Sequence, residues 1–177
     1  MVYIQKNLKK SDMKKIAIFL LANCLCMAHA QTLSKNDVKF MNEAAEGGLM
    51  EVRLGELSQM NATTPEVKSA GKTMVTDHSK ANEELKNLAL GKNVLLPESM
   101  DPKKQKKYDD LAKLTGKKFD KAYAKCMVKD HKKDIAEFKK EAKKADDPAL
   151  RNWAQGKIAI LEGHLQLWKD ACKAVKK

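Results

Sequence analysis

The sequence predicts an all-α protein folded as a four-helix bundle. Residues 31–177 contain almost none of the alternating apolar and polar runs that indicate strands. Apolar residues instead recur at alternating spacings of three and four along four long segments, which is the pattern of helices packed side by side. The four prolines of the chain lie at or outside the ends of these segments. A chain of 177 residues is long enough for one such domain.

Residues 1–30 are predicted to be a signal peptide that is removed on export. Two lysines at 14–15 precede an apolar run at 16–27, and Ala28-His29-Ala30 follows it. A basic stretch, a short apolar stretch and an A-x-A site form a secretory signal. The apolar run is too short to span a membrane. We therefore expect cleavage after Ala30 and a periplasmic or secreted domain at 31–177, with association with the outer membrane left open.

Capping residues and helix breakers define the ends of the four helices. The first helix is opened by Ser34 or Asn36, and the second begins at Pro65, a residue favoured in the first turn. Asp147 directly precedes Pro148 and is expected to cap the last helix. In chain order, the predicted helices cover residues 35–61, 65–91, 117–145 and 148–175.

The connection at about 92–116 is lysine-rich and unusually long for a helix bundle. It holds two prolines and is expected to contain a short helix at 103–114. A connection of about 25 residues exceeds the usual 2–8, so it should cross the length of the bundle. The second and third long helices would then run parallel, as in ferritin-like folds with one long crossover.

The charge of the chain describes mainly a solvated helical surface. Removal of residues 1–30 leaves 30 of the 35 basic and 22 of the 23 acidic residues, a net charge of +8. The run Lys103–Lys107 could make weak contact with anionic components of the cell envelope, although an exposed connection explains it as well. No aromatic residues interleave with this run, so a nucleic-acid partner is not expected.

One polar residue interrupts each apolar seam near the middle of its helix. Glu51 lies about 12 residues before the corner at 63–64, and His78 about 14 after it. His131 lies about 16 residues before the corner at 147, and His164 about 17 after it. At ~1.5 Å per residue, each pair is within a turn of the same height. These four side chains are therefore predicted to meet in one layer of the core.

Three imidazoles and one carboxylate in one layer suit a transition metal ion such as zinc, copper or iron. The predicted metal ligands are His78, His131, His164 and Glu51. Asn82 and Asp134, each about one turn beyond a histidine, are candidate partners of the ring N–H groups. Asp77 and Asp130 are expected to point about 100° away from the histidines, as flanking or surface residues.

Two other interpretations stay open at this point. The histidines could form a metal-free, hydrogen-bonded layer in a bundle that serves as an interaction or structural module of the envelope. A metal-dependent oxidase or hydrolase would need an open coordination position, which a sequence does not show. The sequence contains no Gly-rich phosphate loop and no G-x-S-x-G motif. We therefore predict metal binding rather than catalysis.

Two further features concern the third long helix. Residues 74–80 and 127–133 share five of seven residues, which indicates a duplication or a shared local demand. Cys126 and Cys172 would be an even pair in an oxidising compartment, which permits a disulfide. Their distances from the corner at 147 differ by roughly one helical turn, ~5 Å, so they are expected to lie near each other.

The sequence resembles a bacterial family of exported, ferritin-like proteins catalogued as domain of unknown function 4142. The resemblance covers residues 36–172 and rests on four segments: Phe40…Gly47-Gly48…Glu51…Leu54-Gly55, Met74-Val75-Thr76-Asp77-His78, Phe119-Asp120-Lys121-Ala122-Tyr123 with His131, and His164-Leu165. It implies a ferritin-like four-helix fold and export, and no settled activity.

Two departures limit what the resemblance implies for chemistry. A proline that often precedes the last histidine in the family is replaced here by Ala159. Ferritin-like di-iron sites use Glu-x-x-His pairs, and the residues three before the histidines are Val75, Val128 and Leu161. A single metal ion is therefore favoured over a di-iron centre.

Overall fold

The structure of the protein is a computed structural model that describes residues 33–176. The predicted signal peptide at 1–30 lies outside the described residues. Residues 32–177 group into one compact unit, and within 33–176 the secondary structure consists of five helices without strands. These helices are α2 (Lys35–Asn61), α3 (Pro65–Leu90), α4 (Pro102–Ala112), α5 (Gly116–Lys144) and α6 (Pro148–Ala174). The predicted ends of the long helices are correct to within one residue.

The helices begin where the capping residues predict. Ser34 caps α2 through a capping box in which its hydroxyl accepts from the Asp37 N–H, while the Asp37 carboxylate accepts from the Ser34 N–H. Asp147 caps α6 by accepting from the N–H groups of Ala149 and Leu150. These caps satisfy amide groups that the first helical turn leaves without partners.

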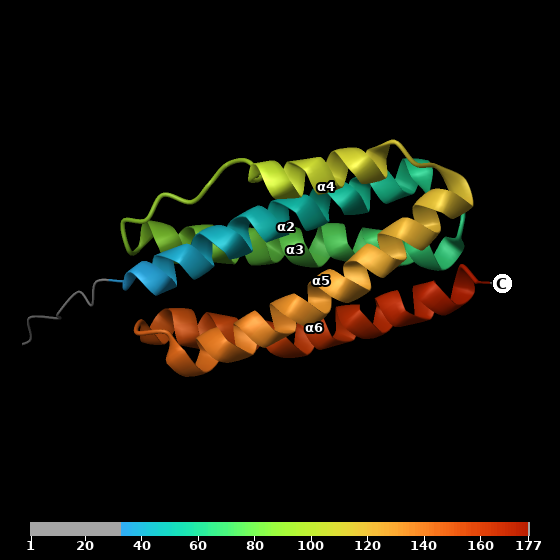
Figure 1. The fold of residues 1–177 in the computed structure, drawn as a ribbon. Coiled ribbons are helices and arrows are strands. Elements are labelled where there is room, and N and C mark those ends of the chain that lie inside the picture. The colour runs from blue at the N-terminus through green and yellow to red at the C-terminus, as the bar shows by residue number, and fades with distance from the viewer. Residues whose placement is uncertain (1–32, 177) are drawn as a thin grey trace, which may run out of the picture. The chain divides into compact units, whose positions relative to one another are not determined.

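The long helices form a four-helix bundle made of two antiparallel hairpins. α2 packs along α3, and α5 packs along α6; α3 also contacts α6, and α2 contacts α5. Figure 1 shows that α3 and α5 run in the same direction, because the connection between them returns along the length of α2. α4 lies in that connection, against α2 and α5. The predicted all-α bundle with a long crossover is confirmed.

Each hairpin corner is held by a carboxylate from the other hairpin. Buried Asp120 on α5 accepts from the backbone N–H groups and hydroxyls of Thr63 and Thr64. Buried Asp37 on α2 accepts from the N–H groups of Asp146 and Asp147. The two aspartates are 83 residues apart, as are the first residues of α3 and α6. The first hairpin thus corresponds to the second when 83 is added to its residue numbers. The sequence match between α3 and α5 instead has a shift of 53 residues.

Two glycines allow α2 and α3 to approach closely. A methyl group built on Gly55 would lie 2.5 Å from the carbonyl oxygen of Gly71, and one on Gly71 would lie 2.0 Å from the Ser58 hydroxyl. Backbone thus packs against backbone at this crossing, and larger side chains would force the helices apart.

The apolar core consists of two clusters, one toward each end of the bundle. One cluster is centred on Phe119, Tyr123 and Trp168. The other includes Phe40, Leu85 and Leu150, with the partly buried rings of Phe138 and Trp153 packed against it. The residues between the clusters include the three histidines and Glu51, which belong to neither. The core therefore changes from apolar to polar in its middle layer.

The lysine run of the connection is largely paired within the bundle. Lys104 forms ion pairs with Glu46 and Asp101, and Lys107 with Asp130. Lys106 pairs with Asp110 on the same helix. The pairs with Glu46 and Asp130 join α4 to α2 and α5. Contact of the lysine run with anionic envelope components stays a prediction. No helix among residues 33–176 combines the length and apolar character that crossing a membrane would require.

Cys126 and Cys172 are both free thiols in this structure. Both are partly buried and pack against the same core cluster. The Cys126 thiol donates to the Asp130 carboxylate at 3.4 Å, and burial raises the pKa of this thiol to about 12. A thiol with so high a pKa is a poor nucleophile at neutral pH.

Candidate metal centre

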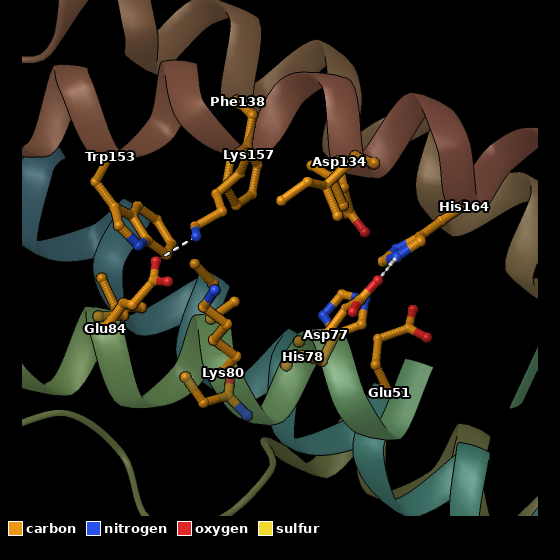
Figure 2. A pocket seen from close by; sticks show the side chains of 18 of the residues that line it. Glu51, Asp77, His78, Lys80, Glu84, Asp134, Phe138, Trp153, Lys157 and His164 are labelled. Atoms are coloured by element: carbon orange, nitrogen blue, oxygen red, sulfur yellow. Dashed lines mark hydrogen bonds and ion pairs between the residues drawn. The ribbon is translucent and has the colours of Figure 1, made fainter. Parts of the chain in front are cut away.

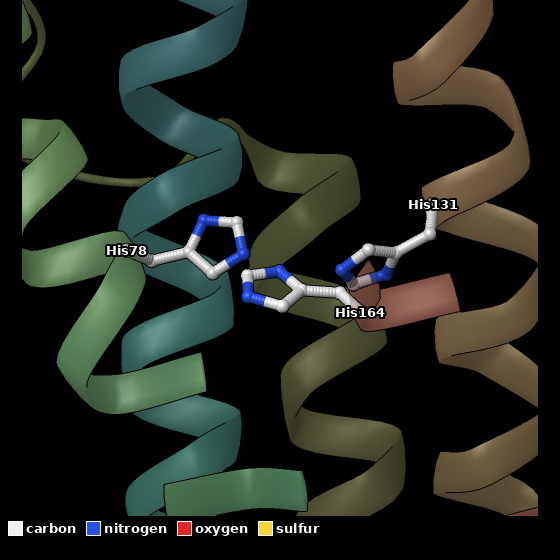
Figure 3. Close-up of side chains that lie close together, drawn as sticks. All are labelled: His78, His131 and His164. Carbon is white, nitrogen blue, oxygen red and sulfur yellow. The ribbon is translucent and has the colours of Figure 1, made fainter. Parts of the chain in front are cut away.

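The imidazole rings of His78, His131 and His164 lie together in the middle layer of the bundle (Figure 3). They come from α3, α5 and α6. The ring centroids are 5.3 to 6.0 Å apart, and each ring offers a nitrogen within 4.8 Å of one on each of the others. The predicted convergence of the three histidines is therefore confirmed. It arises because all three lie near mid-helix on faces that point into the bundle.

The hydrogen bonds of two rings determine which nitrogen carries the proton and which is left without a partner. His131 Nδ1 is 3.0 Å from the Met127 carbonyl oxygen, which can only accept, so Nδ1 carries the proton. His164 Nε2 is 2.7 Å from Asp77 Oδ2 and donates to it. The remaining nitrogens, His131 Nε2 and His164 Nδ1, are buried without a hydrogen-bond partner among residues 33–176, and so is His78 Nε2. One such nitrogen on each ring is what three metal ligands require.

The environment keeps two of these rings neutral at pH 7. Burial, followed by repulsion from His164 and His131, lowers the pKa of His78 to about 3. Burial and His164 lower the pKa of His131 to about 4, against a smaller opposing effect of the Met127 hydrogen bond. A neutral imidazole keeps the lone pair that binds a metal ion. Both residues can therefore act as ligands without first losing a proton.

The nitrogens lie within 4.8 Å of one another, a limit slightly wider than the spacing in an occupied site. Three atoms 4.8 Å apart lie about 2.8 Å from their common centre, whereas zinc–nitrogen bonds are ~2.1 Å. An ion would therefore draw each ring inward by up to about 0.7 Å.

The fourth predicted ligand, Glu51, lies at the edge of the cluster. Its carboxylate is not part of the group of nitrogens within 4.8 Å of one another. Glu51 lines the same cavity as His78 and His164, and Figure 2 shows it at the histidine end. Both carboxylate oxygens are buried without a partner among the described residues. Burial, then Asp134 and Asp130, raise its pKa well above the usual range. Coordination by Glu51 stays a prediction.

The expected partners of the ring N–H groups are partly wrong. Asp77, predicted to point away, binds the ring of His164 on the neighbouring helix α6. Asn82 packs against Gly48, where a methyl group would lie 1.9 Å from its Oδ1. Asp134 lines the cavity, and burial raises its pKa to about 7. The sequence predicted partners only within one helix. The contact between Asp77 on α3 and His164 on α6 joins two helices and was therefore missed.

Asp130 pairs with Lys107, and no hydrogen bond joins it to the three histidine rings among residues 33–176; its predicted flanking position stays a prediction. It occupies the same place in its sequence motif as Asp77 does. The two motifs thus place identical residues in different environments.

A cavity of about 260 Å³ adjoins the histidines. Its walls come from all four long helices, with His78, His164, Glu51 and Asp134 at one end (Figure 2). The other end is lined by residues of the second core cluster, including Trp153 and Phe138, and by the Glu84–Lys157 ion pair beside them. Sequence reasoning missed this cavity because an internal space depends on the sizes and directions of many side chains at once. The one available signal was the small residues on α2 and α3, including Ala44, Gly47 and Ala81.

Comparisons with known proteins agree with this fold. The sequence model of a family described as "Domain of unknown function (DUF4142)" matches residues 22–170, and the chain belongs to this family. A crystal structure of a DUF305 fragment from Deinococcus radiodurans has a similar fold, with a TM-score of 0.70. The two chains are 10% identical, and the similarity covers 80% of this chain and 98% of that one. A comparison with curated proteins found no match.

Proposed function

We propose that this protein binds a single transition metal ion, zinc, copper or iron, through His78, His131 and His164. Two observations carry the proposal: each of the three rings offers a nitrogen within 4.8 Å of one on each of the others, and each ring has one buried nitrogen without a hydrogen-bond partner among residues 33–176. Leaving three such nitrogens unpaired in a protein interior is costly. A metal ion would satisfy all three at once.

The hydrogen bonds of the rings support the same proposal. Metal-binding histidines commonly donate their other ring N–H to a carboxylate or a backbone carbonyl. His164 donates to Asp77, and His131 to the Met127 carbonyl. Glu51 would stand beside the ion and, once the ion attracts it, lose its proton and balance part of the charge.

We further propose that this protein is exported and serves in metal handling or stress protection in the cell envelope. This part rests on the signal sequence, and its test is the N-terminal sequence of the protein recovered from culture. Export with cleavage predicts Gln31 as the first residue. A product that keeps residues 1–30 and stays in the cytoplasm would contradict it.

Metal binding is tested with protein purified without a histidine tag. After removal of metals, titration with zinc, copper(II) and iron(II) should give one ion per chain for at least one of them. Replacement of any one of the three histidines with alanine should reduce that affinity about 100-fold or more and remove the metal-dependent rise in thermal stability. The rise itself follows from linkage, because the ion binds only the folded state.

The opposing result is equally specific. If no ion binds with defined stoichiometry, the middle layer is a metal-free polar core. Each histidine variant would then change the thermal stability by the same amount with and without metal.

A further inference from the structure

The cavity beside the histidines has a histidine end and an aromatic end, and exposed Lys80 and Ile160 are part of its wall. The histidine end holds His78, His164 and the buried carboxyl of Glu51. His131 does not line the cavity, so it would hold the ion from the far side. Three protein nitrogens leave at least one coordination position of a zinc, copper or iron ion unfilled. The cavity lies on the side where that position could open.

The aromatic end is formed by three rings in mutual contact. Phe40 and Phe138 are 5.0 Å apart between ring centroids, and Trp153 lies 5.5 Å from Phe138 and 6.4 Å from Phe40. The Lys157 ammonium lies 5.9 Å from the centroid of the Trp153 ring. Apart from the buried Trp153 Nε1–H, these rings offer water few hydrogen bonds. A flat apolar group would instead be removed from bulk water and would meet ring faces and edges.

Small side chains create the space between these two ends. Ala44 and Gly47 on α2 and Ala81 on α3 line the cavity, and a methyl group built on Gly47 would have no neighbour within 4 Å. The solvent side lies between α3 and α6. There Lys157 pairs with Glu84 (Figure 2), and the exposed residues Lys80 and Ile160 also line the cavity. The cavity thus meets the surface at these side chains.

We propose that the cavity binds a small aromatic molecule whose oxygen donor completes the coordination of the metal ion. This inference rests on the proposed function, since the donor needs an ion to bind. The aromatic body would lie against Phe40, Phe138 and Trp153, and the donor would reach the open position between His78 and His164. Enclosure by four helices excludes a folded partner or a peptide strand. Pockets of this kind, apolar with a few convergent polar groups, are typical of small-molecule sites.

Three probes separate the contribution of each end. Benzohydroxamate carries a metal-binding head and an aromatic ring, acetohydroxamate carries the head alone, and benzamide carries the ring without a strong donor. Binding of each is measured by calorimetry to metal-loaded and to metal-free protein. Benzohydroxamate should bind the metal-loaded protein ~10-fold or more tightly than acetohydroxamate, because it buries a phenyl ring. Removal of the metal should abolish most of the affinity of both hydroxamates.

A variant that fills the cavity tests where the ring binds. Ala44→Leu places three more carbons in the space and should remove most of the preference for benzohydroxamate, while the affinity for acetohydroxamate changes less than about threefold. Gly47→Leu fills the same space and replaces Ala44→Leu if that variant does not fold. Ala159→Leu, on the exposed face of α6, is the matched control and should leave both affinities unchanged.

The outcomes distinguish this inference from the proposed function. If elemental analysis finds one ion per chain but the two hydroxamates bind equally, the aromatic site is refuted and metal binding stands. If the preference survives both cavity-filling variants, the ring binds elsewhere, and the inference is again wrong. If no ion binds, both proposals fall together.

Discussion

Replacing Asp77 with asparagine should weaken metal binding about 10- to 100-fold. The Asp77 carboxylate accepts the Nε2–H of His164 at 2.7 Å, which fixes the ring and leaves Nδ1 buried without a partner among the described residues. Changes to a carboxylate that supports a metal-binding histidine typically cost this much affinity. The loss corresponds to about 1.4–2.7 kcal/mol, at 1.36 kcal/mol for each factor of ten. Asparagine keeps an acceptor oxygen and loses only the charge, so we expect the lower part of this range.

The assay is a competition titration at pH 7 against a chelator that changes colour when it loses its metal. Asp130→Asn is the matched control, because Asp130 stands at the same place in the second copy of the motif but pairs with Lys107. The control should change the affinity less than about threefold, since exposed or partly exposed ion pairs are weak. Equal losses in both variants, or no loss in Asp77→Asn, would refute the assigned role of Asp77.

Three further predictions concern the bundle itself, and each is checked by unfolding. Gly55→Ala should destabilise the protein by about 1–3 kcal/mol through its clash with Gly71, while Gly156→Ala, on an exposed helical face, should stabilise it by about 0.5–1 kcal/mol. Asp120→Ala should cost about 2–4 kcal/mol, because it leaves the N–H groups at the α2–α3 corner without an acceptor. Glu141→Gln should stabilise the protein at pH 8 by on the order of 1–2 kcal/mol and have little effect at pH 4.

The sign for Glu141 follows from its raised pKa. Burial, then the nearby Asp37, raise the pKa of Glu141 from 4.5 to about 7 in the folded protein. The folded state therefore favours the protonated carboxyl, and stability is lost as the pH rises from about 4.5 through 7. Glutamine stays neutral throughout and avoids this loss. An equal effect of the substitution at both pH values would show that Glu141 does not titrate in this window.

Most of the fold could be predicted because its information is local. Helix ends depend on caps and prolines such as Ser34, Pro65 and Asp147, which act within a turn of the chain. The crossover followed from the length of the connection alone. The histidines could be placed in one layer because helical rise converts a count of residues into a height.

What the sequence did not provide depends on contacts between helices. The pairing of Asp77 with His164 depends on how α3 and α6 are rotated about their axes relative to each other. The periodicity of apolar residues does not determine this rotation precisely enough to pair individual side chains. The role of Asp120 was missed for the same reason, since its partners at Thr63 and Thr64 lie on the other hairpin. The sequence match between α3 and α5 is now better explained by a shared structural requirement than by a duplication. The two hairpins correspond at a shift of 83 residues rather than 53, and both matching segments supply a histidine to one cluster.

Asp37 and Asp120 each bind the corner of the other hairpin, and this arrangement predicts how the chain behaves when it is cut into two fragments. A chain cut within residues 92–100 would give two fragments, each lacking the carboxylate that closes its own corner. Each fragment would also carry an uncovered apolar face, and the histidines would be split between them. Neither half should therefore hold its shape alone, and mixing them should restore helical circular dichroism in one concerted step. Each hairpin thus depends on the other for its own corner. A metal ion that bridges α3 to α5 and α6 would cross-link the two hairpins.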